Sequence, residues 1–463
     1  MNVATLLRLE SGLRIRAGLV GAGQFGHGFV AQSARSPHVE VVALAERDVA
    51  KARAAFRAAG VDDARVRECA TEGEAARALA EGARVVVEEG RLLAALPIDV
   101  VVEATGEPET GARNALAAIE GGKHVAIASK ETDCVVGPIL FERARERGLV
   151  YTPVDGDQPS LAIGLVAWAR LLGLEVVAAG KATEYDFVYD AARATVVCNR
   201  REVAARGLDG LWRIGAADPR PLLDARASLL AGLTRATVPD LAELAIVANA
   251  TGLRPDVPEL HAPIARTLEV PAILRPRPEG VLGAAGALDV FCCLRRTDEA
   301  SFAGGVFVVV RCEDAVTWGT LREKGMPVTG DGRHALLYNP QHLLGIEALA
   351  SVISAVGAGA ASGGDAPRPV CDVYARAARD LAAGEPLALG ERHSLPGVEP
   401  VITDARPADG TNPVPYYLAA GATLARAVPK GALIACDAVQ RAPDSVLAAL
   451  RREQDRRFLG AAR

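Results

Sequence analysis

The chain has 463 residues, of which 50% are apolar and 24% charged, and a formal net charge of −5. This length and apolar content exclude a disordered chain and allow two or three domains, each with its own core. The acidic balance argues against a nucleic-acid or anionic-membrane partner. We expect no secretory signal, and we expect no membrane span because no run reaches the roughly 18 apolar residues that a span needs. Eight scattered cysteines without zinc spacing indicate the reducing cytoplasm.

The segment RIRAGLVGAGQFGHG predicts a dinucleotide-binding turn. An apolar strand over residues 15–20 runs into a Gly-x-Gly-x-x-Gly pattern and then into a helix. The first glycine makes a tight turn, the second lets the backbone approach a pyrophosphate, and the third lets helix and strand pack closely. The residues predicted to contact the cofactor here are Gly21, Gly23, Gln24, Phe25 and Gly26.

The next strand, VEVVALAE, ends in an acid at the place where a ribose hydroxyl needs an acceptor. That acid, Glu46, favours NAD because a carboxylate repels a 2′-phosphate. The neighbouring Arg47 favours NADP, since it could bind the same phosphate. The residues leave this choice open.

Alternating strands and helices continue to residue 157 and predict a parallel, doubly wound sheet. We expect strands over 85–89, 98–106, 123–131 and 149–157, and helices over 109–122 and 137–148. Ligands of such sheets bind at the carboxyl ends of the strands. Those ends place Thr105 and Gly106 beside the cofactor, together with Lys130 and the pair Asp155 and Asp157.

Three of these side chains could take part in chemistry. Lys130 can donate a hydrogen bond to a substrate oxygen or to the cofactor ribose, or else be solvated beside Glu131. Asp155 and Asp157 offer two ligands for Mg²⁺ or Mn²⁺, which would polarise a substrate ketone. The pair could instead form an Asx-type turn, or one of them could act as a base.

From about residue 160 the pattern changes to strands of a mixed sheet and a long helix over 238–252. Lys181 ends the strand EVVAAGKA, where it is a candidate proton donor and acceptor or a surface lysine, and Glu184 follows closely. Glu243 lies on the long helix and faces either solvent or a site. We therefore expect an α/β protein with a Rossmann domain (1–156), a mixed α+β catalytic domain (157–360) and a small β-rich module (366–463) after a Gly/Ala/Pro-rich linker.

Stretches along nearly the whole chain carry a resemblance to a known group: GLVGAGQFG, GDQPSLAIGLVAWAR, EVVAAGKATEY, AELAIVANATGL, GGVFVVVR and ARDLAAGE. The chain resembles the homoserine-dehydrogenase-like oxidoreductases with a C-terminal SAF domain. That group includes deoxyxylulose-phosphate reductoisomerase-like enzymes and sugar-acid oxidoisomerases. The resemblance implies NAD(P), with NADP slightly favoured, a catalytic region around Asp157 and Lys181, and a homodimer.

A second, local resemblance concerns IASKETD and TPVDGDQPSLAI, which are similar to segments of the standard deoxyxylulose-phosphate reductoisomerases. It implies that Asp155 and Asp157 bind a divalent ion, with Glu243 as a third ligand, and that Lys130 contacts cofactor or substrate. The reductoisomerase-like enzymes carry Asp-Gly-Thr-Lys-Ser before the long helix, and here Pro239 replaces that lysine. A sugar-phosphate substrate is therefore in doubt, unless Arg235 substitutes through a shift of register.

Together these patterns predict an NAD(P)-dependent oxidoreductase that acts on a small polar hydroxy or keto compound. Hydride transfer coupled to a skeletal rearrangement is the first hypothesis, because a metal-held hydroxy-ketone suits that step. Simple dehydrogenation of a homoserine-like alcohol is the alternative. A dinucleotide-binding sensor without turnover is a third hypothesis, from a different class of protein.

Overall fold

The computed structural model describes residues 12–215 and 218–460. The chain divides into two compact units: a first unit of Met1–Ser160, Leu343–Glu399 and Ala405–Arg463, and a second unit of Leu161–His342 and Pro400–Asp404. Each unit combines helices with a sheet, so the predicted α/β class is confirmed. The three-domain division drawn from the sequence stays a prediction.

The first unit is built on a seven-stranded sheet in which every pairing is parallel. The strands lie in the order β3 (Val66–Glu68), β4 (Arg84–Val87), β2 (Val39–Ala45), β1 (Ile15–Val20), β5 (Val100–Glu103), β6 (His124–Ile127) and β7 (Tyr151–Pro153). The chain leaves β1 toward one edge and returns through β5 toward the other. The topological switch point, where such sheets bind ligands, therefore lies between β1 and β5.

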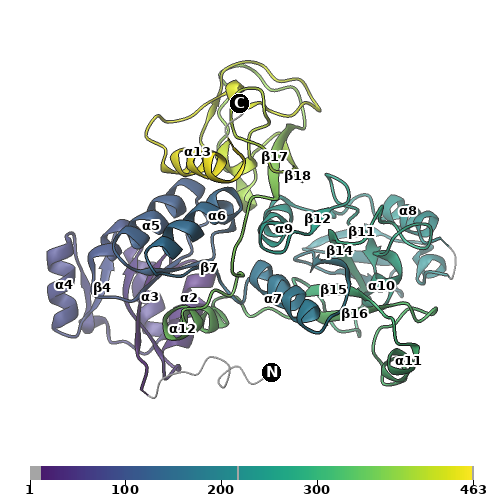
Figure 1. Ribbon diagram of the computed structural model, residues 1–463, viewed down its shortest axis with the longest axis horizontal. Coiled ribbons are helices and arrows are strands. Elements are labelled where there is room, and N and C mark those ends of the chain that lie inside the picture. Colours follow the sequence, from purple (N-terminus) through teal and green to yellow (C-terminus); the bar gives the residue numbers. More distant parts are fainter. Residues whose placement is uncertain (1–11, 216–217, 461–463) are drawn as a thin grey trace. The chain divides into compact units, whose positions relative to one another are not determined.

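Helices cover both faces of this sheet. They are α2 (Gln24–Ser33), α3 (Val49–Ala58), α4 (Glu72–Ala80), α5 (Pro108–Glu120), α6 (Lys130–Glu146) and α12 (Ala348–Ala358). Figure 1 shows α5 and α6 on one side of β7, and α2 and α12 on the other. Ala348 and Val352 of α12 are fully buried in the same core as β1 and β5, so this helix completes the sheet unit although it follows the second unit in sequence.

The sequence prediction at α6 was wrong in its boundary. We expected a strand over 123–131 and a helix from residue 137, but β6 ends at Ile127 and α6 begins at Lys130. Acids in the first turn favour a helix N-terminus at this point, and the helix continues through the internal Pro138. Beside that proline, the side-chain amide of Gln454 bonds the Ile139 amide (3.2 Å) and the Val135 carbonyl (2.9 Å), so both backbone groups are satisfied.

The C-terminal segment of the chain has short strands and one long helix. Its elements are β17 (Cys371–Ala377), β18 (Val398–Asp404), β19 (Thr423–Leu424), β20 (Val439–Gln440) and α13 (Val446–Phe458), which supplies Gln454. β19 and β20 pair in antiparallel fashion. The SAF-like assignment of this segment stays a prediction.

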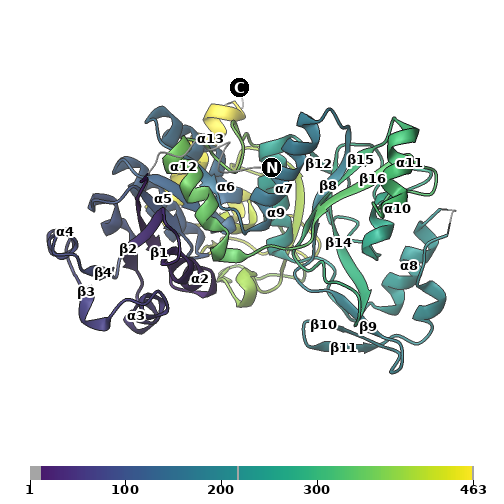
Figure 2. The same cartoon turned by 90° about the horizontal axis from the view of Figure 1, so that it is seen from below.

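The second unit contains a mixed sheet, as predicted. Its order is β11 (Arg201–Ala204), β10 (Thr195–Cys198), β9 (Phe187–Asp190), β14 (Ala287–Arg296), β8 (Val176–Ala182), β15 (Val306–Arg311) and β16 (His334–Asn339), with β12 (Arg254–Pro255) and β13 (Ile264–Ala265) also on β14. The helices are α7 (Gln158–Leu171), α8 (Arg220–Leu229), α9 (Val238–Thr251), α10 (Val270–Ile273) and α11 (Ala315–Glu323). β14 pairs with β8 along its first half and with β9 at its end, where Figure 2 shows β10 and β11 alongside.

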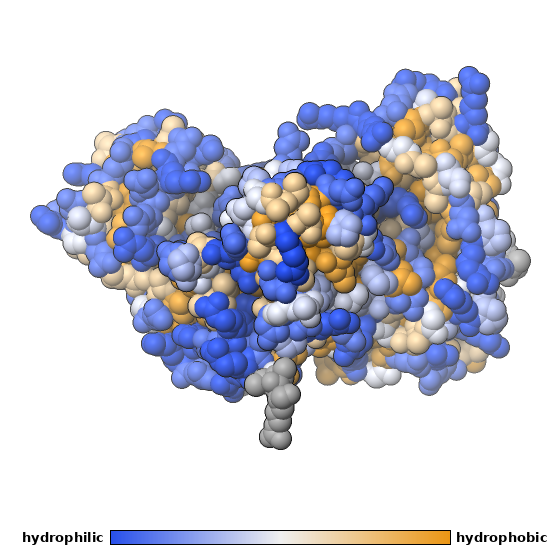
Figure 3. All heavy atoms as spheres, turned by 90° about the horizontal axis from the view of Figure 1, so that it is seen from above, coloured by the Kyte–Doolittle hydropathy of each residue, from blue (hydrophilic) through white to orange (hydrophobic). Residues whose placement is uncertain are grey.

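Polar side chains dominate the face of the molecule in Figure 3, with apolar residues in small groups between them. Within residues 12–215 and 218–460, no helix has the length and apolar character to cross a membrane.

Candidate functional site

The glycine turn after β1 has the shape that a dinucleotide needs. Gly21 has φ +93°, and a Cβ there would lie 2.7 Å from the carbonyl oxygen of Ala104. A Cβ on Gly26 would lie 2.1 Å from the carbonyl oxygen of Gly21, so α2 starts in close contact with the strand end. Nothing lies within 4 Å of the Cβ position of Gly23. The turn is therefore closed toward the protein and open on the side where a pyrophosphate would approach.

The acid after β2 is fixed against this turn. Glu46 accepts hydrogen bonds from the backbone amides of Ala22 (2.8 Å) and Asp48 (3.0 Å), one on each carboxylate oxygen. Arg47 is exposed beside it. These positions fit both predicted contacts with the cofactor ribose, and the preference for NAD or NADP stays a prediction.

The first helical residues after the turn differ in their surroundings. Gln24 is exposed, whereas Phe25 is half-buried and packs against the sheet core. Phe25 thus has a packing role in addition to its predicted place beside the cofactor.

The loop after β5 faces the glycine turn across the switch point and is fixed on two sides. The hydroxyl of Thr105 donates to the carboxylate of Glu103 (2.6 Å), and the amide of Gly106 donates to the hydroxyl of Ser129 (2.9 Å). Glu103 is fully buried, and burial raises its pKa. A fixed loop at this position is suited to bind the cofactor, as predicted for Thr105 and Gly106.

Lys130 and Asp157 come together at the same edge of the sheet. The Nζ of Lys130 lies 3.7 Å from Oδ1 of Asp157, and both side chains are mostly buried. The convergence expected at the strand ends is therefore present for this pair. Lys130 has a partner other than Glu131, the neighbour that the sequence suggested.

The contacts of Asp155 and Asp157 also fit the turn interpretation. Asp155 accepts a hydrogen bond from the Ser160 hydroxyl, and burial raises its pKa. Asp157 accepts from the amide of Gln158 (3.0 Å) at the start of α7, and Gly156 between the two acids has φ +85°. Over the described residues, no group of three or more His, Cys, Asp or Glu side chains is arranged to hold a metal ion. The metal site of Asp155, Asp157 and Glu243 stays a prediction, and no step below depends on a metal ion.

A histidine from the C-terminal segment reaches the cofactor edge, which the sequence did not predict. The Nδ1 of His393 lies 3.0 Å from the carbonyl oxygen of Gly106 and 3.5 Å from Oε1 of Glu131. His393 and Arg392 have φ of 56° and 52°, a conformation that costs energy in residues other than glycine. Such strain occurs frequently at functional sites.

Two acids at the start of α6 have strongly shifted pKa values. Burial raises the pKa of Glu131 to about 7, against the opposing charges of Lys130 and His393. Burial raises the pKa of Asp133 to about 7 as well, although Asp133 accepts a hydrogen bond from the Tyr151 hydroxyl (2.8 Å). Buried acids that titrate near neutrality are frequent in active sites.

The second unit holds a buried cluster around Lys181. The Nζ of Lys181 lies 2.9 Å from Oδ1 of Asp240 and also bonds Oε2 of Glu243, and these three side chains are at most 3% exposed. The surface-lysine interpretation is therefore wrong, and Glu243 points inward. Glu184 is exposed in the loop that follows β8.

Asp240 was missed by the sequence analysis. It lies one turn before Glu243 on α9, so both carboxylates share a face of the helix. Its other oxygen accepts from the amide (2.8 Å) and the hydroxyl (2.7 Å) of Thr237, which forms a capping box. The signal was the Thr-x-x-Asp spacing, which predicts a helix start but not a partner for Lys181.

Family models match two separate stretches of the chain. Residues 21–152 match the family model of the homoserine dehydrogenase NAD binding domain, and residues 156–215 and 223–348 match that of the oxidoreductase DRL catalytic domain. The glycine turn, Lys130 and the loop after β5 lie in the first match, and the Lys181 cluster lies in the second.

Similarity to individual proteins is partial. The chain is 36% identical over 81 residues to 1-deoxy-D-xylulose 5-phosphate reductoisomerase of Exiguobacterium sibiricum, which covers 17% of this chain and 21% of that protein. It is 38% identical over 100 residues to the same enzyme of Heliobacterium modesticaldum, which covers 19% and 25%. The solved structure of that reductoisomerase from Zymomonas mobilis in complex with NADPH is 24% identical, with 37% and 46% covered and a TM-score of 0.28. The chain thus spans about a fifth to a quarter of the length of these curated relatives.

Proposed function

We propose that this chain is an enzyme that couples hydride transfer to rearrangement of a small hydroxy-ketone. The matches to a homoserine-dehydrogenase-type NAD-binding domain and to a DRL catalytic domain support an NAD(P)-dependent oxidoreductase. One observation carries this proposal: the buried ammonium of Lys181 between Asp240 and Glu243, inside the catalytic match. A lysine paired and desolvated in this way is suited to proton transfer at a substrate oxygen.

The proton and the hydride have separate sources. The glycine turn would hold a dinucleotide, which would supply the hydride for the carbonyl carbon. Lys181 donates a proton from Nζ to the carbonyl oxygen, so that C=O becomes CH–OH, and the carboxylates of Asp240 and Glu243 hold the ammonium in place before transfer. In the reverse direction the amine accepts the hydroxyl proton. Fixed carboxylates keep Lys181 in one orientation, which lowers the entropic part of the barrier.

In the first unit, three features support cofactor binding. The glycine turn leaves its outer side open for the pyrophosphate, Glu46 is fixed where a ribose is expected, and the loop at Thr105 is held by hydrogen bonds. Lys130, held near Asp157, is available to the cofactor ribose or to a substrate oxygen. The proposed partner is a small polar metabolite, and we propose a homodimer.

The rearrangement and the simple dehydrogenation differ in the carbon skeleton of the product. The substrate of the partial relatives, 1-deoxy-D-xylulose 5-phosphate, is the first compound to test, together with unphosphorylated hydroxy-ketones and homoserine. Pro239, at the position where the reductoisomerase-like enzymes carry a lysine, favours the unphosphorylated compounds. We expect oxidation of the reduced dinucleotide together with a new skeleton in the ¹³C NMR spectrum of the product; an unchanged skeleton would favour simple dehydrogenation.

A matched pair of lysine variants tests the role of Lys181. Lys181→Arg keeps the charge but displaces the donor, and we expect a loss of at least a hundredfold in kcat, with dinucleotide binding unchanged. Lys324→Arg changes an exposed lysine of the same unit and should leave kcat unchanged. Wild-type turnover by Lys181→Arg would remove Lys181 from the reaction.

A further inference from the structure

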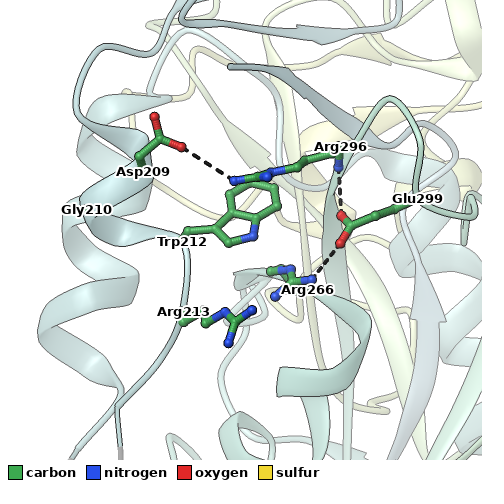
Figure 4. A pocket seen from close by; sticks show the side chains of 7 residues that line it. All are labelled: Asp209, Gly210, Trp212, Arg213, Arg266, Arg296 and Glu299. Carbon is green, nitrogen blue, oxygen red and sulfur yellow. Dashed lines mark hydrogen bonds and ion pairs between the residues drawn. The ribbon is translucent and has the colours of Figure 1, made fainter. Parts of the chain in front are cut away.

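A pocket of about 470 Å³ in the second unit has a lining unlike that of the Lys181 cluster. It lies between the 3₁₀ helix at Leu208–Leu211, the start of the next 3₁₀ helix at Thr267–Glu269, and the end of β14. Its lining residues, shown in Figure 4, are Asp209, Gly210, Trp212, Arg213, Arg266, Arg296 and Glu299.

Two of the three guanidinium groups are held against one indole. The guanidinium carbons of Arg266 and Arg296 lie 5.0 Å and 4.9 Å from the ring centroid of Trp212. Trp212 is itself buried and packs on the ring of Tyr189 at 5.5 Å. These cation–π contacts fix the two arginine heads before any ligand arrives, which reduces the entropic cost of binding.

The lining has more cationic donors than its own carboxylates use. Glu299 bonds the Arg266 side chain (2.6 Å) and the backbone amide of Arg296 (2.8 Å). Asp209 lies 3.7 Å from the Arg296 side chain and also accepts from the hydroxyl of Tyr189. Three guanidinium groups thus face two carboxylates, a positive excess at the pocket.

The pocket keeps exposed guanidinium donors that a ligand can reach. Among the residues that the structure describes, no carboxylate lies within 4.0 Å of the exposed Arg213. The Nε of Arg266 is buried without a hydrogen-bond partner. This Nε is closed off from solvent, so the donors open to a ligand are the exposed guanidinium groups of Arg213 and Arg296.

The pocket is separate from the Lys181 cluster within the same sheet. Val290 of β14 pairs with Lys181, and Arg296 lies six residues further along that strand. At a rise of about 3.3 Å per residue, the two positions are roughly 20 Å apart. A ligand in this pocket therefore does not take part in proton transfer at Lys181.

We propose that this pocket is a phosphate-binding site, built from residues other than those of the glycine turn and of the Lys181 cluster. Its ligand is inorganic phosphate or the phosphate monoester of a small metabolite. The planar guanidinium fork matches two phosphate oxygens at once, so the arginines of the lining are suited to bind phosphate. The proposal goes beyond the oxidoreductase activity and does not depend on it.

Calorimetric titration at constant ionic strength tests this site. Inorganic phosphate, glycerol 3-phosphate and acetate are added separately to the full chain saturated with NADPH, so that the phosphate positions of the glycine turn are filled. Arg213→Ala/Arg296→Ala removes two exposed guanidinium groups, and we expect at least tenfold weaker phosphate binding. Arg213→Lys keeps the charge but loses the fork, and should give a smaller loss. The control, Arg333→Ala, removes an exposed arginine outside the pocket and should bind phosphate as the wild type does.

The outcomes distinguish free phosphate from a phosphate monoester as the ligand, and they include results that would overturn the proposal. Tighter binding of glycerol 3-phosphate than of phosphate supports an organic monoester, and equal binding supports the free ion. Wild-type phosphate affinity in the double variant, provided that its Tm matches the wild type, would overturn the proposal. So would acetate binding as tight as that of phosphate, or a wild type that binds neither phosphate nor its ester.

Discussion

Removal of the ammonium group of Lys181 should greatly lower the free energy of unfolding, although the group is small. In Lys181→Met the apolar stem is kept, but Asp240 and Glu243 lose the ammonium that both of them contact in a region at most 3% exposed. Breaking a buried ion pair from one side costs about 3–5 kcal/mol, because the remaining charge is left in a medium of low polarity. Native proteins are stable by roughly 5–15 kcal/mol, so the loss is a large part of the total.

Urea unfolding followed by far-UV circular dichroism measures this loss directly. Lys181→Met/Glu243→Gln removes one of the two abandoned carboxylates and should recover part of the stability. Lys324→Met, at an exposed lysine of the same unit, should stay within about 0.5 kcal/mol of the wild type. A loss below about 1 kcal/mol in Lys181→Met, with no recovery in the double variant, would refute the buried cluster.

Three further predictions concern the first unit. Gly21→Ala should weaken dinucleotide binding at least tenfold in a fluorescence titration, because Gly21 has φ +93° and an added Cβ would meet the Ala104 carbonyl. The control, Gly28→Ala on α2, places its Cβ in open space and should stabilise the chain by about 0.5–1 kcal/mol. Burial raises the pKa of Asp133 from 3.8 to about 7, so its contribution to stability is fully present below about pH 4 and is lost as pH rises toward about 7. Urea midpoints should fall between about pH 4 and pH 7, and less steeply in Asp133→Asn. His393→Ala should weaken dinucleotide binding a few-fold by freeing the loop whose carbonyl it contacts, while Tm shifts by less than about 3 °C.

Each of these predictions has an outcome that contradicts it. Equal dinucleotide affinities of the two glycine variants would mean that the turn does not bind the cofactor. An Asp133→Asn chain with the same pH slope as the wild type would assign that slope to other groups. Unchanged dinucleotide affinity in His393→Ala would leave His393 a packing residue of the C-terminal segment.

Single elements whose signals lie close together in the sequence were predicted well. The strand over 15–20 and the glycine turn were predicted with their correct limits, because the strand, the three glycines and the helix follow one another directly. The helix over 238–252 was predicted to within one residue, since a capping box marks its start and Gly252 its end.

Contacts between distant segments escaped the sequence analysis for a physical reason. Asp240 meets Lys181 only because α9 packs on β14, the neighbour of the strand that carries the lysine, and no spacing between the two residues encodes that contact. His393 meets Gly106 across 287 positions of the chain. The packing of α12 was also not predicted. Its apolar residues indicate a buried helix face, but they do not show that the face packs on the sheet of the first unit.

Transfer of deuterium tests the central claim most directly. Dinucleotide reduced with deuterium at C4 of the nicotinamide is incubated with the wild-type protein and the panel of hydroxy-ketones, and the product is analysed by mass spectrometry and NMR. The account predicts one deuterium on a carbinol carbon of the product for each dinucleotide oxidised, and none above background in Lys181→Arg. A product without deuterium, or no dinucleotide oxidation with any member of the panel, would contradict it.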